Sequence, residues 1–259
     1  MKTLLKFAAC AAAVMMAVAS PASAAAIKVG IAAEPYPPFA SPDANGKWVG
    51  WEVEIIDAVC AAASLECEIT PVAWDGIIPA LTAKKIDVIM ASMSITEERM
   101  KTIDFSNKYY NTPTVIAGQK SVKMDATPDG VAGKVLGVQV STIHQDYANK
   151  HFPSAAEIKV YQTQDEANQD LVAGRIDATQ ADSIALDAFL ATDEGKACCE
   201  VKGTVEDDPA ILGAGVGVGL RKGEDDLKAK LNDAIAKIRS DGTYEAITKK
   251  YFASDIYGG

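Results

Sequence analysis

The sequence predicts an α/β protein with mostly parallel sheet, and two observations support this prediction. Apolar runs of strand length alternate along the chain with segments whose apolar residues recur at helical spacing. One helix–turn–strand pattern also occurs twice, ninety residues apart, beginning at Leu81 and at Leu171. The alternative is a chance likeness of two amphipathic segments. Otherwise we expect two lobes that share this unit, with Ser92 and Asp182 at equivalent strand ends, where open α/β sheets bind ligands.

The elements of the first half are predicted from apolar spacing and turn residues. Three prolines between Glu34 and Phe39 exclude a helix there and indicate a stiff loop. Asp75 and Thr96 stand where helix N-caps are expected. In order, we expect a strand at 27–31, the loop at 34–39, a turn at Asn45-Gly46, a helix after Gly50 through Val53, Ile56 and Cys60, a strand at 66–72, a helix from Asp75 through Leu81, a strand at 86–91, and a helix that begins at Glu97.

The second half follows the same rules. The stretch from Gly213 to Gly219 alternates glycine with small apolar residues and is not followed by a helix start. We interpret it as a pliable strand near a hinge, not as a dinucleotide-binding loop. In order, we expect a strand at 134–138, a polar turn at Ser141-Thr142, a helix at 147–152, a helix whose apolar face is Leu227, Leu231, Ile235 and Ile238 and which stops at Asp241-Gly242, and a last helix capped by Thr243.

The composition excludes several classes of function. The 259 residues are 49% hydrophobic and 23% charged, as in an ordinary globular protein and unlike a disordered chain. The 25 Lys and Arg against 35 Asp and Glu give a net charge of −10, which argues against a nucleic-acid partner. With 2 His in the whole chain, a His-rich metal site is not expected.

The N-terminus reads as a secretory signal peptide. A start with Lys2 and Lys6 precedes an apolar run at 7–19 and an Ala22-Ser23-Ala24 end, so we predict cleavage after Ala24. The apolar run is too short for a membrane span, and it continues past Cys10, which argues against a lipoprotein. Cleavage removes two lysines, so the mature chain carries 23 − 35 = −12. We therefore expect a soluble protein outside the cytoplasm.

Export makes the cysteines candidates for disulfides. Cys60 and Cys67 are seven apart, which suits a bridge between a helix end and the following strand. The adjacent Cys198 and Cys199 leave three states open: two thiols, a vicinal disulfide, or bonds to other partners. Neither spacing matches a zinc ribbon, so no metal site is predicted.

The segment from Ser92 to Arg99 is a candidate anion site. Ser92 and Ser94 lie on the same side of an extended chain, ahead of a helix start with unpaired backbone N–H groups. A cation in a first helical turn opposes the helix dipole, so Arg99 there suggests a bidentate grip on a carboxylate. The alternative is that Arg99 pairs with acidic neighbours on a solvated surface.

Four other residues are weaker candidates. Tyr36 and Trp74 are placed to sandwich an aliphatic or cationic side chain, although core packing is the more common role of an aromatic residue. Asp182 is a candidate ammonium partner or simply a helix N-cap. Glu34 is a candidate partner for a second cation or an exposed residue beside prolines.

No catalytic residue is predicted. The sequence has no Gly-x-Ser-x-Gly elbow and no His-Glu-x-x-His motif. His144 and His151 lie seven apart, and we expect both on the exposed surface.

The motifs together resemble the periplasmic binding proteins of polar amino-acid ABC importers, among which the likeness is greatest to the lysine/arginine/ornithine-, histidine- and octopine/nopaline-binding proteins. The likeness covers essentially the whole mature chain. The motifs are Tyr36-Pro-Pro-Phe39, Gly50-Trp-Glu-Val-Glu54, Trp74-Asp-Gly-Ile-Ile-Pro-Ala-Leu81, Lys84-Lys-Ile-Asp87, Ser92-Met-Ser-Ile-Thr96 with Arg99, Asp104-Phe-Ser106, Ala173-Gly-Arg-Ile-Asp177, Asp241-Gly-Thr-Tyr244 and Lys249-Lys-Tyr-Phe252.

This resemblance implies a two-lobed periplasmic-binding-protein-like II fold whose lobes, joined by two crossover strands, close on the ligand. Lobe I would comprise 25–111 and 213–259, and lobe II 112–212. The resemblance also implies a monomeric periplasmic protein without a cofactor, which delivers an amino acid to an ABC permease. It assigns the α-carboxylate to Arg99, Ser92, Ser94 and Thr142, the α-ammonium to Asp182, the flanks of the side chain to Tyr36 and Trp74, and a disulfide to Cys60 and Cys67. Ser141, beside Thr142, and Glu34, close to Tyr36, are further candidate ligand contacts.

One position departs from the lysine/arginine/ornithine binder, which has an acidic residue three places before the tyrosine. Ala33 stands there in this chain, and Glu34 is one place closer to Tyr36. The same fold hosts periplasmic cyclohexadienyl or arogenate dehydratases, in which a Glu acts as the acid, and this is the alternative function. A chemosensory receptor domain is a third interpretation, but no membrane span follows in the sequence.

Overall fold

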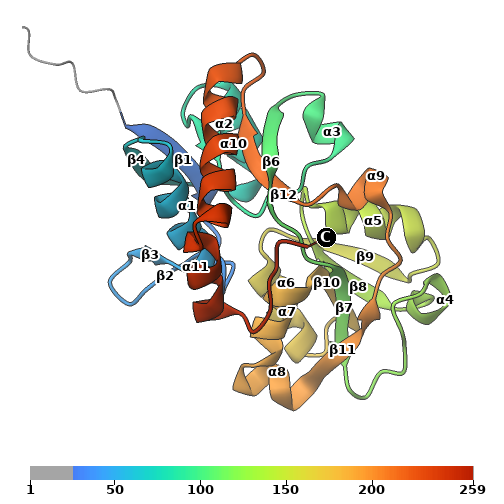
Figure 1. Ribbon diagram of the computed structural model, residues 1–259. Helices are drawn as coiled ribbons and strands as arrows, with labels where there is room; N and C mark the ends of the chain where they lie inside the picture. Colours follow the sequence, from blue (N-terminus) through green and yellow to red (C-terminus); the bar gives the residue numbers. More distant parts are fainter. Residues whose placement is uncertain (1–25, 259) are drawn as a thin grey trace, which may run out of the picture.

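The computed structural model describes residues 26–258, which form two five-stranded sheets with helices packed on them (Figure 1). The α/β fold predicted from the sequence is confirmed. The predicted signal peptide and Cys10 lie outside the described residues. Within 26–258, no helix is long and apolar enough to cross a bilayer.

The first sheet has the strand order β4-β1-β5-β12-β6. Buried residues of β1, β5 and β12 pack with α1 and α10 on one face, and a second cluster centred on Ile89 packs with α2 on the other. The strands are β1 (Ile27–Ala32), β4 (Cys67–Val72), β5 (Val88–Ile89), β6 (Asp104–Tyr110) and β12 (Val216–Leu220).

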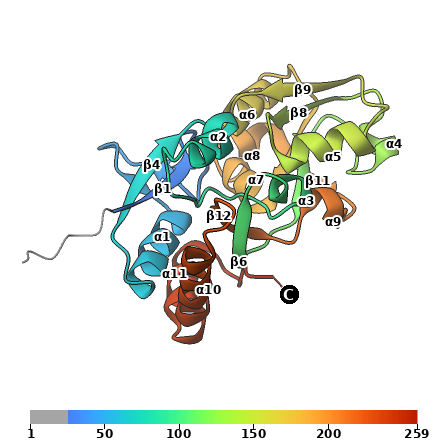
Figure 2. The same ribbon diagram turned by 90° about the horizontal axis from the view of Figure 1, so that it is seen from above.

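The second sheet has the order β11-β7-β10-β8-β9 and lies beside the first in both views (Figures 1 and 2). Its main core contains buried residues of β7, β8 and β10 together with Tyr147 of α5 and Phe152, which directly follows that helix. The strands are β7 (Thr114–Gln119), β8 (Val135–Gln139), β9 (Glu157–Tyr161), β10 (Ala178–Asp182) and β11 (Cys199–Thr204). A small hairpin, β2 (Ser41–Pro42) with β3 (Trp48–Val49), encloses the predicted turn at Asn45-Gly46.

Each sheet is parallel except for one strand. In the first sheet β12 runs antiparallel to its neighbours β5 and β6. In the second, β7 runs antiparallel to β10 and β11. Both reversed strands are the ones that the chain enters when it passes from one sheet to the other, β6 to β7 and β11 to β12. The prediction of mostly parallel sheet is therefore right, and the exceptions mark the crossovers.

The repeated sequence pattern folds as the same unit in both sheets. In the first, α2 leads into β5, and in the second α6 leads into β10. The turn between helix and strand is left-handed in both, at Lys84 with φ 59° and at Gly174 with φ 71°, ninety residues apart. Ser92 follows β5 and Asp182 ends β10, so both lie at strand ends, as predicted.

The helices agree with the predicted order but differ at some ends. Asp75 is not an N-cap, because the chain enters α2 through a 3₁₀ turn, Trp74–Gly76, that contains it. Thr243 is the first residue of α11, and Gly242 at φ 84° precedes it as the N-cap residue without a side-chain bond. Thr142 caps α5 by accepting from Gln145 N at 3.2 Å, so this helix begins four residues earlier than predicted. The helices are α1 (Trp51–Ala62), α2 (Ile77–Thr82), α3 (Glu97–Met100), α4 (Pro128–Val131), α5 (Ile143–His151), α6 (Gln164–Val172), α7 (Ser183–Leu190), α8 (Asp193–Cys198), α9 (Pro209–Leu212), α10 (Asp225–Ser240) and α11 (Thr243–Tyr251).

Two segments join the sheets, at 111–113 and at 205–215. Gly213, in the second segment, has φ 83°, and a Cβ there would lie 2.3 Å from the carbonyl oxygen of Ile95. Only glycine fits this close approach. The predicted pliable strand is thus divided: the stretch through Gly215 is the connection, and β12 is a fully buried strand of the first sheet.

Candidate functional site

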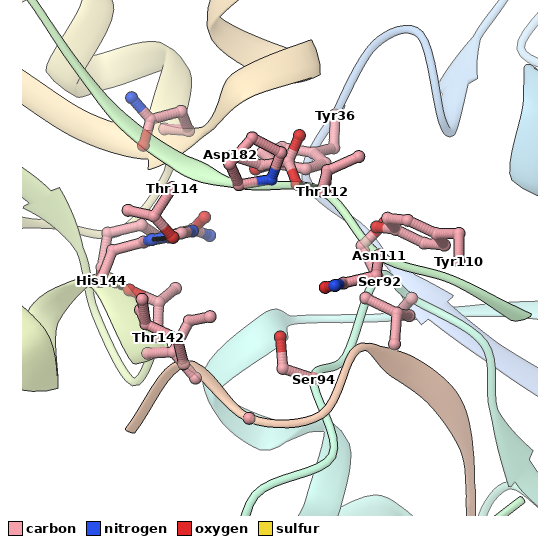
Figure 3. A pocket seen from close by; sticks show the side chains of 18 of the residues that line it. Tyr36, Ser92, Ser94, Tyr110, Asn111, Thr112, Thr114, Thr142, His144 and Asp182 are labelled. Carbon is pink, nitrogen blue, oxygen red and sulfur yellow. Dashed lines mark hydrogen bonds between the residues drawn. The ribbon is translucent and has the colours of Figure 1, made fainter. Parts of the chain in front are cut away.

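A cavity of about 600 Å³ lies between the two sheets and is lined from both. Figure 3 shows its side chains facing one hollow, with His144, Thr114 and Thr142 on one side and Ser92, Ser94 and Asn111 on the other. The predicted site residues that line it are Glu34, Tyr36, Trp74, Ser92, Ser94, Arg99, Thr142 and Asp182. Ser141, the remaining predicted residue, does not line the cavity, but its backbone carbonyl accepts a hydrogen bond from Arg99.

Arg99 projects from α3, whose N-cap Thr96 accepts a hydrogen bond from Arg99 N at 3.2 Å. The guanidinium donates to the carbonyls of Ser94 at 3.0 Å and Ser141 at 3.4 Å, and lies 5.5 Å from the ring centroid of Trp74. Burial lowers the pKa of Arg99 to about 10, so the group remains cationic at neutral pH. Within 26–258 no carboxylate lies within ion-pair distance of Arg99. An anion in the cavity would supply the missing partner.

Asp182 ends β10 and serves as a helix N-cap, one of the two roles predicted for it. Its Oδ1 accepts from the backbone N–H groups of Ile184 at 2.8 Å and Ala185 at 3.4 Å, which caps α7. Its Oδ2 accepts from the hydroxyl of Thr112 in the first crossover. Burial raises the pKa of Asp182 to about 6. Such a carboxylate is costly to keep ionised without a cation beside it.

Glu52 is a site residue that sequence reasoning missed. It is 1% exposed on α1 and lines the cavity. Its carboxylate accepts from Ser92 N at 2.7 Å, from Ser92 Oγ at 3.2 Å and from the hydroxyl of Tyr109. Burial raises the pKa of Glu52. These bonds also hold Ser92 in its left-handed conformation at φ 55°.

The aromatic walls come from two segments that follow strands of the first sheet, Tyr36 after β1 and Trp74 after β4. Tyr36 stacks on the buried ring of Phe39 with centroids 5.8 Å apart. Burial raises the pKa of Tyr36 well above its usual value, and the Asp182 carboxylate adds to the shift. Trp74 N donates to both carboxylate oxygens of Glu34, at 3.1 and 3.2 Å. Glu34 therefore holds the turn that carries Trp74, besides facing the cavity.

The prediction that both histidines are exposed is wrong for His144. Its side chain lines the cavity from the first turn of α5, and its Nδ1 lies 3.3 Å from Thr114 Oγ1. His151 is 31% exposed and pairs with Asp208 at 2.7 Å. Seven residues are about two helical turns, so the two histidines lie on the same side of α5. The helix starts at Ile143, and its first turn places His144 at the cavity between the sheets.

The cysteines form two disulfides away from the cavity. Cys60 at the end of α1 bonds to Cys67 at the start of β4. Cys198 bonds to Cys199 at the junction of α8 and β11, one of the three states that the sequence left open. Across 26–258, no group of three or more His, Cys, Asp or Glu side chains is arranged to hold a metal ion.

Comparisons with known proteins agree with this architecture. The family described as bacterial extracellular solute-binding proteins, family 3, matches residues 27–254. An L-arginine-binding protein of Pseudomonas aeruginosa is 41% identical over 234 residues, 90% of each chain. A histidine-binding periplasmic protein of Salmonella typhimurium is 39% identical, again over 90% of each. The structure of an ancestral arginine-binding protein bound to arginine aligns with a TM-score of 0.80 at 32% identity, over 88% of this chain and 98% of that one.

Proposed function

We propose a function from one premise: the chain belongs to the bacterial extracellular solute-binding proteins of family 3. The resemblance identified in the sequence is thereby confirmed. Its function, on this proposal, is to capture a polar α-amino acid with a basic side chain outside the cytoplasm and to deliver it to an ABC permease. It acts by binding and release, not as an enzyme.

The observation that carries the proposal is the opposite charge of Arg99 and Asp182. The guanidinium comes from α3, between β5 and β6 of the first sheet, and the carboxylate from the end of β10 in the second, and both line one cavity. Neither has an ion-pair partner of opposite charge within 26–258. The α-carboxylate and α-ammonium of an amino acid would satisfy both groups. Ser92, Ser94, Ser141 and Thr142 would surround the carboxylate.

A basic side chain is favoured by the aromatic and acidic groups that line the cavity. Tyr36 and Trp74 offer ring faces to a methylene stem or guanidinium. Glu34 and the buried Glu52 add two carboxylates that line the same cavity. The similar relatives are named for arginine and histidine, which agrees with this assignment.

Closure is proposed to occur about the segments at 111–113 and 205–215, with lobe I as 25–111 and 213–259 and lobe II as 112–212. A zwitterion that meets Arg99 in one lobe and Asp182 in the other favours the closed arrangement, because only there do both contacts form. The cleaved signal peptide, the periplasmic location and the monomeric state belong to the same proposal. The location is supported by the similarity to a histidine-binding periplasmic protein.

The cyclohexadienyl or arogenate dehydratase remains the alternative. It is less supported, because the similar relatives are named as binding proteins. A turnover assay with arogenate and prephenate distinguishes the two functions. We expect no product above that of a no-protein control.

Native mass spectrometry tests the binding function directly. Protein purified from the periplasm without denaturation is expected to retain a mass increment that matches a basic amino acid. The Arg99→Ala variant is the matched control and is expected to lose the increment. An increment on both proteins, or one that matches a ligand without an α-amino-acid group, would contradict the proposal.

A further inference from the structure

His144 occupies a position in the cavity that the proposed grip does not use. It is the second residue of α5, directly after Ile143, and its side chain faces the hollow from the side opposite Ser94 and Asn111 (Figure 3). The cap residue Thr142 stands two positions before it. His144 thus lies where the N-terminal end of a nine-residue helix opens into the cavity.

The imidazole of His144 is neutral at pH 7. Burial lowers its pKa to about 3, and the positive charge of Arg99 adds to the shift. A neutral imidazole carries one N–H donor and one acceptor nitrogen. Among residues 26–258 its hydrogen-bond partner is the hydroxyl of Thr114, 3.3 Å from Nδ1. Thr114 is 5% exposed on β7, so this contact is sheltered from water.

An anion bound by Arg99 would lie near His144, because the charge of Arg99 already acts on that imidazole. Its guanidinium donates to the carbonyl of Ser141, one residue before the cap of α5. A carboxylate held by Arg99 would therefore lie at the N-terminal end of α5, where backbone N–H groups are unpaired. Nε2 of His144 has no partner within the described chain and is open to this part of the cavity.

We propose that His144 is a specificity-determining ligand contact: Thr114 Oγ1–H donates to Nδ1, which fixes the Nε2–H tautomer, and Nε2–H donates to the ligand carboxylate that Arg99 holds. The inference rests on the proposed function, since it needs an amino-acid ligand. Its consequence is a stronger preference for a free carboxylate over a neutral amide, because the carboxylate offers two charged oxygen acceptors to Arg99 and Nε2–H, whereas the amide offers one neutral oxygen.

Calorimetry with arginine and argininamide tests the proposal at pH 7.5. A lost hydrogen bond to a charged group corresponds to about 10- to 100-fold in affinity, so His144→Leu should weaken arginine binding by that factor. The same variant should weaken argininamide binding by a smaller factor, because a hydrogen bond to a neutral amide oxygen is weaker than one to a carboxylate. His144→Gln retains an N–H donor and should recover most of the arginine affinity, and Thr114→Val should weaken arginine binding by freeing the tautomer. His151→Gln is the matched control and should bind as the wild type does.

A second measurement does not depend on a variant that folds. The chain has 2 histidines, so a ¹⁵N-histidine spectrum of the whole protein contains the signals of two imidazole rings, each with its own Nδ1 and Nε2. The pattern of the Nε2–H tautomer is expected for His144, with an Nε2 shift on addition of arginine and no shift for His151. An Nδ1–H tautomer, or unchanged discrimination in His144→Leu, would overturn the inference. If the wild type binds neither compound nor any other basic amino acid, the proposed function fails instead.

Discussion

Arg99 Nη2 donates to the backbone carbonyl of Ser141 at 3.4 Å, although the two residues follow strands of different sheets. The same guanidinium donates to Ser94 in its own lobe at 3.0 Å. Arg99 thus links the two walls of the cavity through neutral carbonyls, and the Asp146 carboxylate acts on it only from beyond ion-pair distance. A ligand carboxylate would supply the close anionic partner that Arg99 lacks within 26–258.

Replacing Arg99 with alanine should weaken ligand binding by about 100-fold or more, because the ligand carboxylate would be left underpaired in a partly buried site. Arg99→Lys keeps the charge but loses the planar fork, so an intermediate loss is expected. Isothermal titration calorimetry measures both, with circular dichroism to verify the fold. Near-normal affinity in a folded Arg99→Ala protein would show that another group holds the carboxylate.

Asp182→Asn should stabilise the ligand-free protein while weakening ligand binding. Burial raises the folded-state pKa of Asp182 to about 6, above the unfolded value near 4, so its contribution to stability falls as pH rises between about 4 and 6. Asparagine can retain the cap on α7 without that charge. We expect a gain of about 1–3 kcal/mol in unfolding free energy at pH 7.5, and none at pH 4.

Urea unfolding at the two pH values measures this difference, with Asp57→Asn on the exposed face of α1 as the matched control. A gain that is the same at both pH values would mean that burial of the Asp182 charge is not its cause. A loss of stability at pH 7.5 would mean that the ionised group is already compensated in the ligand-free protein.

The disulfide between Cys60 and Cys67 should be present in the exported protein and should stabilise it. It closes a short loop between α1 and β4, which corresponds to roughly 2–3 kcal/mol. The double variant with serine at both positions should lose about that much in urea unfolding. Non-reducing peptide mapping checks the bond itself, and recovery of both residues as free thiols would refute it.

Glu34→Gln should weaken binding of a cationic ligand more than that of a neutral one. The amide oxygen can still accept from Trp74 N, so the aromatic wall should stay in place while the charge is lost. We expect about a three- to tenfold loss for arginine and little change for glutamine, because the group is only half-buried. Competition titration measures the ratio, and Glu68→Gln, exposed on β4, is the control. An unchanged ratio would contradict the assignment of Glu34 to the cationic end of the ligand.

The repeated helix–turn–strand unit was predictable because it depends on local patterns. An apolar helix face, a turn and an apolar strand are all encoded within thirteen residues. The strand of each copy, β5 or β10, is the central strand of its sheet. Cap positions were harder to predict. Asp75 has the chemistry of an N-cap, yet the backbone turns before it, and nothing in the local sequence separates a 3₁₀ entry from a direct helix start.

The site was predicted where its residues carry a motif and missed where they depend on burial. Glu52 shares the helical spacing of Ile55, Ile56 and Val59, so its place on the buried face of α1 was visible in the sequence. A carboxylate there points to a polar cluster, but its partner Tyr109 lies 57 residues away. His144 gave no such sign, because its environment comes from Thr114 and Arg99 on distant segments.

A thermal-shift panel on protein stripped of ligand by unfolding and refolding tests the central claim most directly. A ligand at 100 times its dissociation constant adds about 2.7 kcal/mol to stability, which for a chain of this size is a rise of roughly 5–10 °C. The panel comprises arginine, lysine, ornithine, histidine, glutamine, glutamate, octopine and nopaline. We predict the largest rise with a basic amino acid. A rise with glutamate alone would contradict the basic specificity, and no rise with any compound would contradict amino-acid binding itself.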